Sequence, residues 1–212
     1  SHQKALAIKP GFASAYFNLG NALRELGRLT EAVKRYSDAL TIKPDYAEAH
    51  SNLGAVFEEL GQSEKALVHY NKALTIKPEY AEAHSNLGLR LQKQGQLKEA
   101  IRSYQKAINI KPDYTQAHSN LGNAFKELGR FKEAIFHFHK SIYYKPDFAE
   151  AHSNLGNVLN DLGQLDEAVT SYHKALAIKP DYAEAHYNLG NVLKDLGQLD
   201  QAVVNYHKAL TL

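Results

Sequence analysis

All six prolines of this chain recur at one fixed interval of 34 residues: Pro10, Pro44, Pro78, Pro112, Pro146 and Pro180. Twelve of the 13 glycines keep the same period, six in the series from Gly20 to Gly190 and six in the series from Gly27 to Gly197. The letters AHSNLG also return once per period over much of the chain. A period in this range is typical of stacked repeats, in which each unit packs mainly against its neighbours.

Within one period, residues 47–80, the pattern predicts two helices. Small or apolar residues recur with helical spacing on both sides of Gly61, namely Ala49, Leu53, Val56, Phe57 and Leu60 before it and Ala66, Leu67, Tyr70, Ala73, Leu74 and Ile76 after it. Gly61 can end the first helix and Pro78 cannot extend the second. Gly54 costs about 1 kcal/mol relative to alanine inside a helix. We therefore expect the paired helices to approach closely at Gly54 and Ala66.

Eight positions of each unit resemble the signature of tetratricopeptide repeats. In the second unit they are His50, Leu53, Gly54, Phe57, Ala66, Tyr70, Ala73 and Pro78. The resemblance implies an all-α, right-handed superhelical solenoid of helix-turn-helix repeats. The recurring segment AHSNLG is similar to the repeats in the superhelical domain of O-linked N-acetylglucosamine transferases. We expect the end of a preceding repeat at 1–12, followed by repeats at 13–46, 47–80, 81–114, 115–148, 149–182 and, truncated, 183–212.

Two departures from the family signature suggest looser packing. The first large residue of the signature, often tryptophan in the family, is Tyr16 in the first unit and histidine in the other five. Ser141 replaces the second small alanine in the fourth unit.

Composition narrows the classes of protein. Hydrophobic residues make up 44% and charged residues 23% of the 212 residues, as in a folded soluble chain. No apolar run approaches the roughly 18 residues of a membrane span, and we expect neither membrane insertion nor a signal peptide. The net charge of +2 gives no support for nucleic-acid binding. The absence of cysteine is consistent with a cytoplasmic protein.

The histidines invite a metal site, but their spacing argues against one. Five of the 11 occur once per unit: His50, His84, His118, His152 and His186. Packed helices lie about 10 Å apart, whereas zinc needs its nitrogen ligands about 2 Å away. No phosphate loop, nucleophile elbow or H-E-x-x-H motif is present. We therefore expect no catalytic residue, no metal, no cofactor and no enzymatic activity.

In the family, the first helices line a concave groove, and one stripe of residues on each first helix would face it. Steps of four, three and four positions keep residues on one helix face. The second position of this stripe is always asparagine. This asparagine ladder comprises Asn18, Asn52, Asn86, Asn120, Asn154 and Asn188, and the next stripe position adds a second row, Asn21, Asn123, Asn157 and Asn191.

Each amide of the ladder can donate and accept a hydrogen bond, which matches a peptide backbone. Two other interpretations remain open: the amides are solvated surface groups, or they bond the neighbouring turn. The first stripe position is often acidic, at Glu48, Glu82, Glu150 and Glu184. The six stripes carry nine acids and one base, Lys93. We therefore expect a partner that is neutral or basic.

The sequence predicts a non-catalytic scaffold that binds an extended peptide or protein segment. One alternative is the substrate-recognition arm of a larger enzyme, such as a glycosyltransferase. Another is a self-assembling scaffold, because Val203, Tyr206 and Leu210 would leave an apolar face open for end-to-end association. A clamp for a chaperone carboxylate is not expected, since no basic residue precedes a ladder asparagine.

Overall fold

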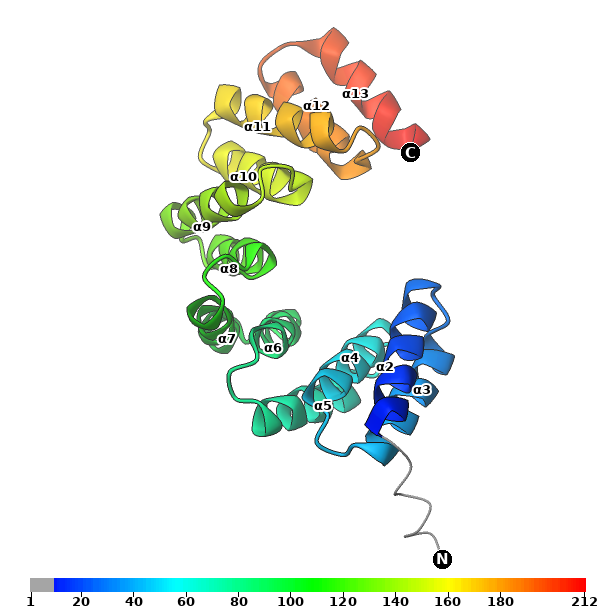
Figure 1. Cartoon of the computed structure of the whole chain (residues 1–212). Helices are drawn as coiled ribbons and strands as arrows, with labels where there is room; N and C mark the ends of the chain where they lie inside the picture. Colours follow the sequence, from blue (N-terminus) through cyan, green and yellow to red (C-terminus); the bar gives the residue numbers. More distant parts are fainter. Residues whose placement is uncertain (1–9) are drawn as a thin grey trace, which may run out of the picture. The chain divides into compact units, whose positions relative to one another are not determined.

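The computed structural model describes residues 10–212, and these residues form helices without strands (Figure 1). They divide into two compact units, one ending at Ile110 and the other running from Lys111 to Leu212. The first unit contains α2 (Pro10–Glu25), α3 (Leu29–Ile42), α4 (Ala47–Glu59), α5 (Ser63–Ile76), α6 (Ala81–Lys93) and α7 (Leu97–Ile110). The second contains α8 (Thr115–Glu127), α9 (Phe131–Tyr144), α10 (Ala149–Asp161), α11 (Leu165–Ile178), α12 (Ala183–Asp195) and α13 (Leu199–Thr211).

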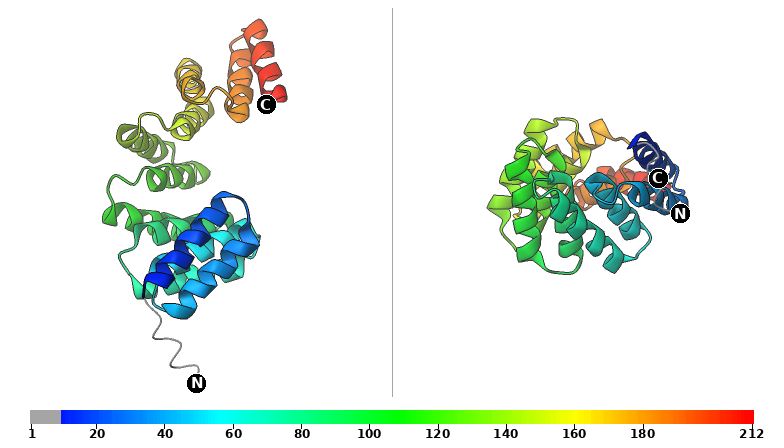
Figure 2. Two further views of the ribbon diagram at one scale, coloured as in Figure 1. Left: turned by 45° about the vertical axis from the view of Figure 1, so that its right-hand side comes forward. Right: turned by 60° about the horizontal axis from the view of Figure 1, so that its bottom comes forward.

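Within each unit, every even-numbered helix packs beside the odd-numbered helix that follows it (Figure 2). The even-numbered helices are therefore the first helices of the predicted repeats. From α4 to α12 they begin at the residues where those repeats begin. The first helix, α2, begins three residues earlier than expected, and most of the predicted 1–12 segment lies outside the described residues. The division into repeats itself stays a prediction.

The turn inside each repeat is set by a glycine. Gly61 has a φ of 71°, a left-handed conformation that favours glycine. Its amide donates to the Glu58 carbonyl at 3.0 Å, and the Gln62 amide donates to the Phe57 carbonyl at 2.8 Å. This pair of bonds is a Schellman motif, which satisfies carbonyls at the end of the first helix. The five equivalent glycines have φ values of 70–75°.

The glycines inside the first helices allow a buried ring to touch the helix backbone. A Cβ atom on Gly54 would lie 2.7 Å from Cε1 of Tyr70. The same contact recurs in each repeat, with Phe138 against Gly122 and a tyrosine elsewhere. Tyr36, Tyr104 and Phe138 have no exposed surface. The expected close approach is therefore confirmed, and its cause is an aromatic ring sixteen residues after each glycine.

The expectation of looser packing at the two departures is wrong. The five periodic histidines are only 4–8% exposed, and each Nε2 lies 2.8–3.1 Å from a proline carbonyl, as His50 does with Pro44. Ser141 is completely buried, and its hydroxyl donates to the Thr115 carbonyl at 3.1 Å. Histidine and serine keep the packing here because each also makes a hydrogen bond between segments.

One repeat carries a buried charge where its copies are apolar. Arg90 is 6% exposed. Its Nε lies 3.0 Å from Oε1 of Glu58, and its Nη2 lies 3.4 Å from Oε1 of Glu64. The equivalent residues of the other repeats are Ala22, Val56, Ala124, Val158 and Val192. Arg90 therefore links α6 to both helices of the preceding repeat.

We predict that Gly122→Ala destabilises the protein although alanine is the better helix former. The new Cβ would lie 2.7 Å from Cε1 of Phe138, a ring that has no room to move. Overpacking of this kind costs about 1 to 3 kcal/mol, against a helix-propensity gain of about 1 kcal/mol. Urea unfolding followed by circular dichroism gives the midpoint. In a Phe138→Leu background the same substitution should cost less, and a Gly122→Ala midpoint at or above the parent's would contradict the prediction.

Candidate functional site

The asparagine ladder lies on the first helices, at the edge between core and solvent. Asn18 is exposed, and the other five ladder residues are half-buried. The second-row asparagines are half-buried as well. Several of these amides make hydrogen bonds within the protein, and some of their partners lie in neighbouring repeats.

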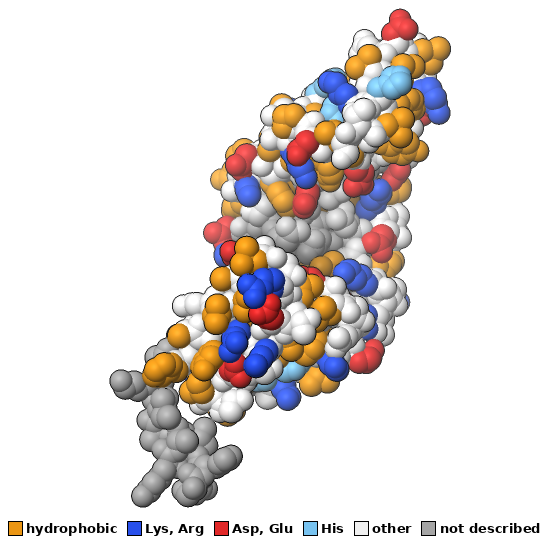
Figure 3. Space-filling model, turned by 90° about the vertical axis from the view of Figure 1, so that its right-hand side faces the viewer, with side chains coloured by type: hydrophobic (Ala, Val, Ile, Leu, Met, Phe, Trp, Pro, Cys, Tyr) orange, Lys and Arg blue, Asp and Glu red, His pale blue; other side chains and the backbone are white. Residues whose placement is uncertain are grey.

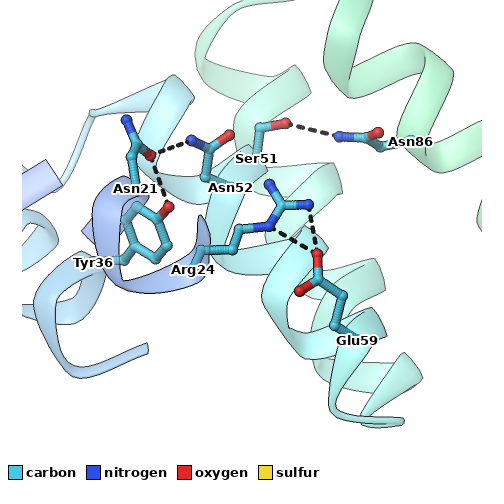
Figure 4. A network of polar contacts seen from close by, with 7 residues as sticks. All are labelled: Asn21, Arg24, Tyr36, Ser51, Asn52, Glu59 and Asn86. Atoms are coloured by element: carbon cyan, nitrogen blue, oxygen red, sulfur yellow. Dashed lines mark hydrogen bonds and ion pairs between the residues drawn. The ribbon is translucent and has the colours of Figure 1, made fainter. Parts of the chain in front are cut away.

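In the first unit, three side chains from three helices meet at one oxygen (Figure 4). The Tyr36 hydroxyl of α3 donates to Oδ1 of Asn21 at 2.7 Å. Nδ2 of Asn52, on α4, donates to the same oxygen at 2.8 Å. Asn21 therefore serves as an acceptor that joins its own repeat to the next one.

The second unit repeats this arrangement. The Tyr172 hydroxyl donates to Oδ1 of Asn157 at 2.7 Å, and Nδ2 of Asn188 donates to it at 3.0 Å. Burial raises the pKa of Tyr172, so its hydroxyl keeps the proton that it donates. Tyr206 donates to Asn191 at 3.0 Å in the last repeat. Sequence reasoning missed these tyrosines, although they follow their asparagines at a constant spacing of fifteen residues.

This network gives the two rows of asparagine different roles. The second-row residues Asn21 and Asn157 use their oxygens inside the protein. The ladder residues Asn52 and Asn188 use one N–H and keep the carbonyl oxygen and the second N–H available. Both line polar hollows on the surface of the first helices, of about 340 Å3 at Asn52 and about 310 Å3 at Asn188. The bonds of Asn52 and Asn188 go to an asparagine on the preceding first helix and not to a neighbouring turn, which was the bonding interpretation expected from the sequence.

The other asparagines are held less firmly. Asn86 reaches only Ser51 Oγ, at 3.5 Å, and Asn120 accepts from Gln116 at 3.0 Å. Asn18, Asn123 and Asn154 make no side-chain hydrogen bond to the part of the chain that the structure describes. Asn123 lacks a tyrosine partner because Phe138, at the equivalent position, has no hydroxyl.

The acidic stripe is partly neutralised by bases from other positions. Nη2 of Arg24 lies 2.6 Å from Oε1 of Glu59. Nζ of Lys126 lies 3.6 Å from Oδ2 of Asp161, and Nζ of Lys194 lies 3.9 Å from Oδ1 of Asp195. Lys77 lies 3.2 Å from Glu48. On the face of the molecule that Figure 3 displays, acidic and basic side chains are interspersed. The sequence count of nine acids and one base therefore overstates the negative charge.

A second group of polar contacts joins histidines nineteen residues apart. Nδ1 of His50 lies 2.9 Å from Nδ1 of His69, and Nδ1 of His118 lies 3.1 Å from Nδ1 of His137. A carbonyl only accepts, so Nε2 of His50 must donate to Pro44. In the neutral pair, Nδ1 of His50 then accepts and Nδ1 of His69 donates. Sequence reasoning missed these pairs, because it weighed the periodic histidines only against each other.

Burial places the pKa of these histidines below the ordinary value. It lowers the pKa of His69 and of His137 to about 4, with a smaller contribution from the paired ring. Burial also lowers the pKa of His50 and of His118. Over residues 10–212, no three side chains of the kinds that ligate metals gather in one place. No helix in the same range could span a membrane.

Comparison with known families accounts for nearly all of the sequence. A family model described as a TPR repeat matches residues 20–61, 59–95, 88–129, 122–160 and 156–197. Models described as a tetratricopeptide repeat match residues 3–34 and 183–212. No curated protein matches the chain.

Solved structures share the fold at low sequence identity. Pseudomonas aeruginosa pilF is 22% identical with a TM-score of 0.82, over 92% of this chain and 89% of that one. A chain of the APC/C hetero-tetramer Cut9-Hcn1 is 19% identical with a TM-score of 0.88, over 99% of this chain and 42% of that one. YrrB, described as a TPR protein with an unusual peptide-binding site, is 23% identical with a TM-score of 0.62, over 83% of this chain and 91% of that one. These likenesses confirm the all-α repeat fold.

We predict that the histidine pairs make stability depend on pH. Their folded pKa values lie below the ordinary value of about 6.5, so the unfolded chain takes up protons first. The contribution of the histidine pairs to the free energy of unfolding is fully present above about pH 6.5 and is lost as the pH drops toward 4. Between pH 7.5 and 5 we expect a loss of about 1 to 2 kcal/mol for each pair.

Urea unfolding at both pH values measures this loss. The matched control is His69→Ser with His137→Ser, because Ser103 and Ser171 stand at the same position in other repeats. The control should show a smaller loss between the two pH values. Equal losses in parent and control would show that the pairs do not titrate in this range.

Proposed function

Because this chain belongs to the tetratricopeptide-repeat family, whose members serve as scaffolds for protein interaction, we propose that it binds an extended peptide segment along the asparagine ladder. The observation that carries the proposal is the way Asn52 and Asn188 are held. Each spends one N–H on the preceding repeat and lines a polar hollow with its remaining groups. Amides fixed in this way can bind with little loss of side-chain freedom.

The proposal favours recognition of the peptide backbone. A backbone offers an N–H donor and a C=O acceptor at every residue, and a ladder amide offers both in return. Such binding tolerates many side chains. Charge adds a preference for neutral or basic segments in the second unit, where Glu150 and Glu184 are exposed and form no ion pair with the described residues.

The same surface serves the alternative roles expected from the sequence. An enzyme arm that presents substrate to a catalytic domain would hold an extended segment in the same way. The family is generally non-catalytic, and the proposed activity is binding alone. YrrB, which shares the fold, is described as having a peptide-binding site. A cytoplasmic location stays a prediction.

We predict that replacing Asn86, Asn120 and Asn154 together by alanine weakens peptide binding without unfolding the protein. These amides make few bonds within the protein, so little stability is lost. Each lost hydrogen bond to a peptide is worth about 0.5 to 1.5 kcal/mol, which gives at least a ten-fold loss in affinity for the three. The probe is a fluorescent 15-residue peptide of serine, alanine and threonine, followed by anisotropy.

Two controls make this test specific. Asn71→Ala with Asn109→Ala removes two exposed amides from the second helices and should leave affinity unchanged. A probe with N-methyl groups at alternate residues should bind the parent weakly, because its backbone donors are blocked. Versions of the probe with three lysines or three glutamates test the charge preference. Equal affinity of the parent and the triple variant would refute the ladder as a binding site.

A second candidate function is end-to-end assembly with another copy of this chain. Tyr187, Tyr206 and Leu210 line an apolar hollow of about 490 Å3, and Leu210 is 83% exposed. In the first repeat, Phe17 occupies the position of Tyr187 and packs on Tyr46, the residue directly before α4, with ring centroids 5.0 Å apart. Phe12 occupies the position of Tyr46 and is 48% exposed. A second copy could therefore place Phe12 on Tyr187.

Analytical ultracentrifugation over a concentration series tests this assembly. We expect the average mass of the parent to rise with concentration. Tyr187→Asp with Leu210→Asp should shift the rise to higher concentration, because a charge would be buried at the contact. A parent that stays monomeric throughout the series would exclude the proposed contact.

A further inference from the structure

The second row of asparagines is interrupted in two consecutive repeats. The residues at this position are Asn21, Ala55, Leu89, Asn123, Asn157 and Asn191. The interruption changes the hydrogen bonds of the tyrosines beneath it. Tyr104, under Leu89, donates instead to Gln92 Oε1 at 2.8 Å. Tyr70, under Ala55, has no asparagine to receive its hydroxyl proton.

Tyr70 is buried and its hydroxyl has no partner among residues 10–212. Its side chain is 2% exposed, and Tyr36, Tyr172 and Tyr206 show what an equivalent hydroxyl normally does, since each donates to its asparagine. The hydroxyl oxygen itself is accessible from outside the protein, because it is not one of the fully buried polar atoms that lack a partner. Tyr70 lines a hollow of about 180 Å3 on the surface of the first unit.

The hollow combines apolar surface with three cations, of which one forms no ion pair with the described residues. Ala55 and Leu89 contribute the apolar surface, and Leu89 is 40% exposed. Most of its charges are already paired, Arg24 with Glu59 and Arg90 with Glu58. Lys93 is exposed and forms no ion pair with the described residues. Asn86 of the ladder lines the same hollow.

We propose that this hollow is a specificity pocket of the groove, which takes an aliphatic side chain of the bound peptide while the Tyr70 hydroxyl donates to a peptide carbonyl. The inference rests on the proposed peptide-binding function. A leucine-sized side chain suits the volume and the apolar walls. The amide of Asn86 pairs with the peptide backbone beside it, and Lys93 favours an acidic residue next to the aliphatic one. The preferred ligand at this point of the groove is therefore an aliphatic residue with an acidic neighbour.

The test uses a host peptide of 15 serines, alanines and threonines with one central position varied. Host peptides with central alanine, leucine, leucine–glutamate and leucine–lysine are compared by fluorescence anisotropy. For the parent, we expect leucine to bind about fifty-fold more tightly than alanine, since about three additional carbon groups are buried. Leucine–glutamate should bind more tightly than leucine–lysine, and added salt should reduce that difference.

Ala55→Asn is the decisive variant, because it restores the residue that four other repeats carry and fills the hollow. It should give the Tyr70 hydroxyl an acceptor and preserve folding. The affinity for the leucine peptide, relative to that for the alanine peptide, should fall to about one. Tyr70→Phe should weaken the leucine peptide three- to ten-fold. Tyr172→Phe, whose hydroxyl already donates to Asn157, is the matched control and should leave the ratio unchanged.

The outcomes separate this pocket from the wider proposal. The pocket is refuted, and ladder binding stands, if the alanine peptide binds and the parent has equal affinity for the leucine and alanine peptides. The same conclusion holds if the Ala55→Asn variant still prefers the leucine peptide as strongly as the parent does. If the leucine peptide binds and the triple ladder variant does not weaken it, the ladder is refuted and the pocket stands alone. If neither peptide binds the folded parent, both proposals fail.

Discussion

The contact between a first-helix glycine and a second-helix ring determines the geometry of every repeat. With no Cβ at Gly54, the ring of Tyr70 lies directly on the helix backbone. This contact fixes how closely the two helices approach and how they are rotated. The tyrosine hydroxyl is then carried past the helix to its far surface. At Tyr36 and Tyr172 it emerges beneath the second-row asparagine.

Core and surface are therefore connected through single side chains. Tyr36 is buried in the core and donates to Asn21, which in turn accepts from Asn52 of the next repeat. The orientation of a surface amide thus depends on ring packing inside the neighbouring repeat. Where one residue of this hydrogen-bond network is replaced, as at Ala55 or Phe138, the polar groups at the surface change while the fold does not.

The sequence was sufficient to predict the repeat architecture but only part of the site. The 34-residue spacing of the prolines and glycines predicts the helix pairs and their turns, and helical periodicity predicts the face that carries the ladder. The pairs His50–His69, Tyr36–Asn21 and Arg24–Glu59 were not predicted. These pairs join different helices, and their formation depends on the rotation of one helix against another, which periodicity along a single helix does not reveal. The acidity of the stripe was overestimated for the same reason.

Nearly identical repeats face the problem of pairing in the correct order during folding. Arg90 offers a solution, because only the repeat before it supplies Glu58 and Glu64 at the positions that its guanidinium reaches. If α6 packed one repeat too early, Arg90 would meet Arg24 and Thr30 at those positions. A buried charge without a partner is strongly unfavourable. The buried ion pair thus disfavours packing of α6 on the first repeat in place of the second.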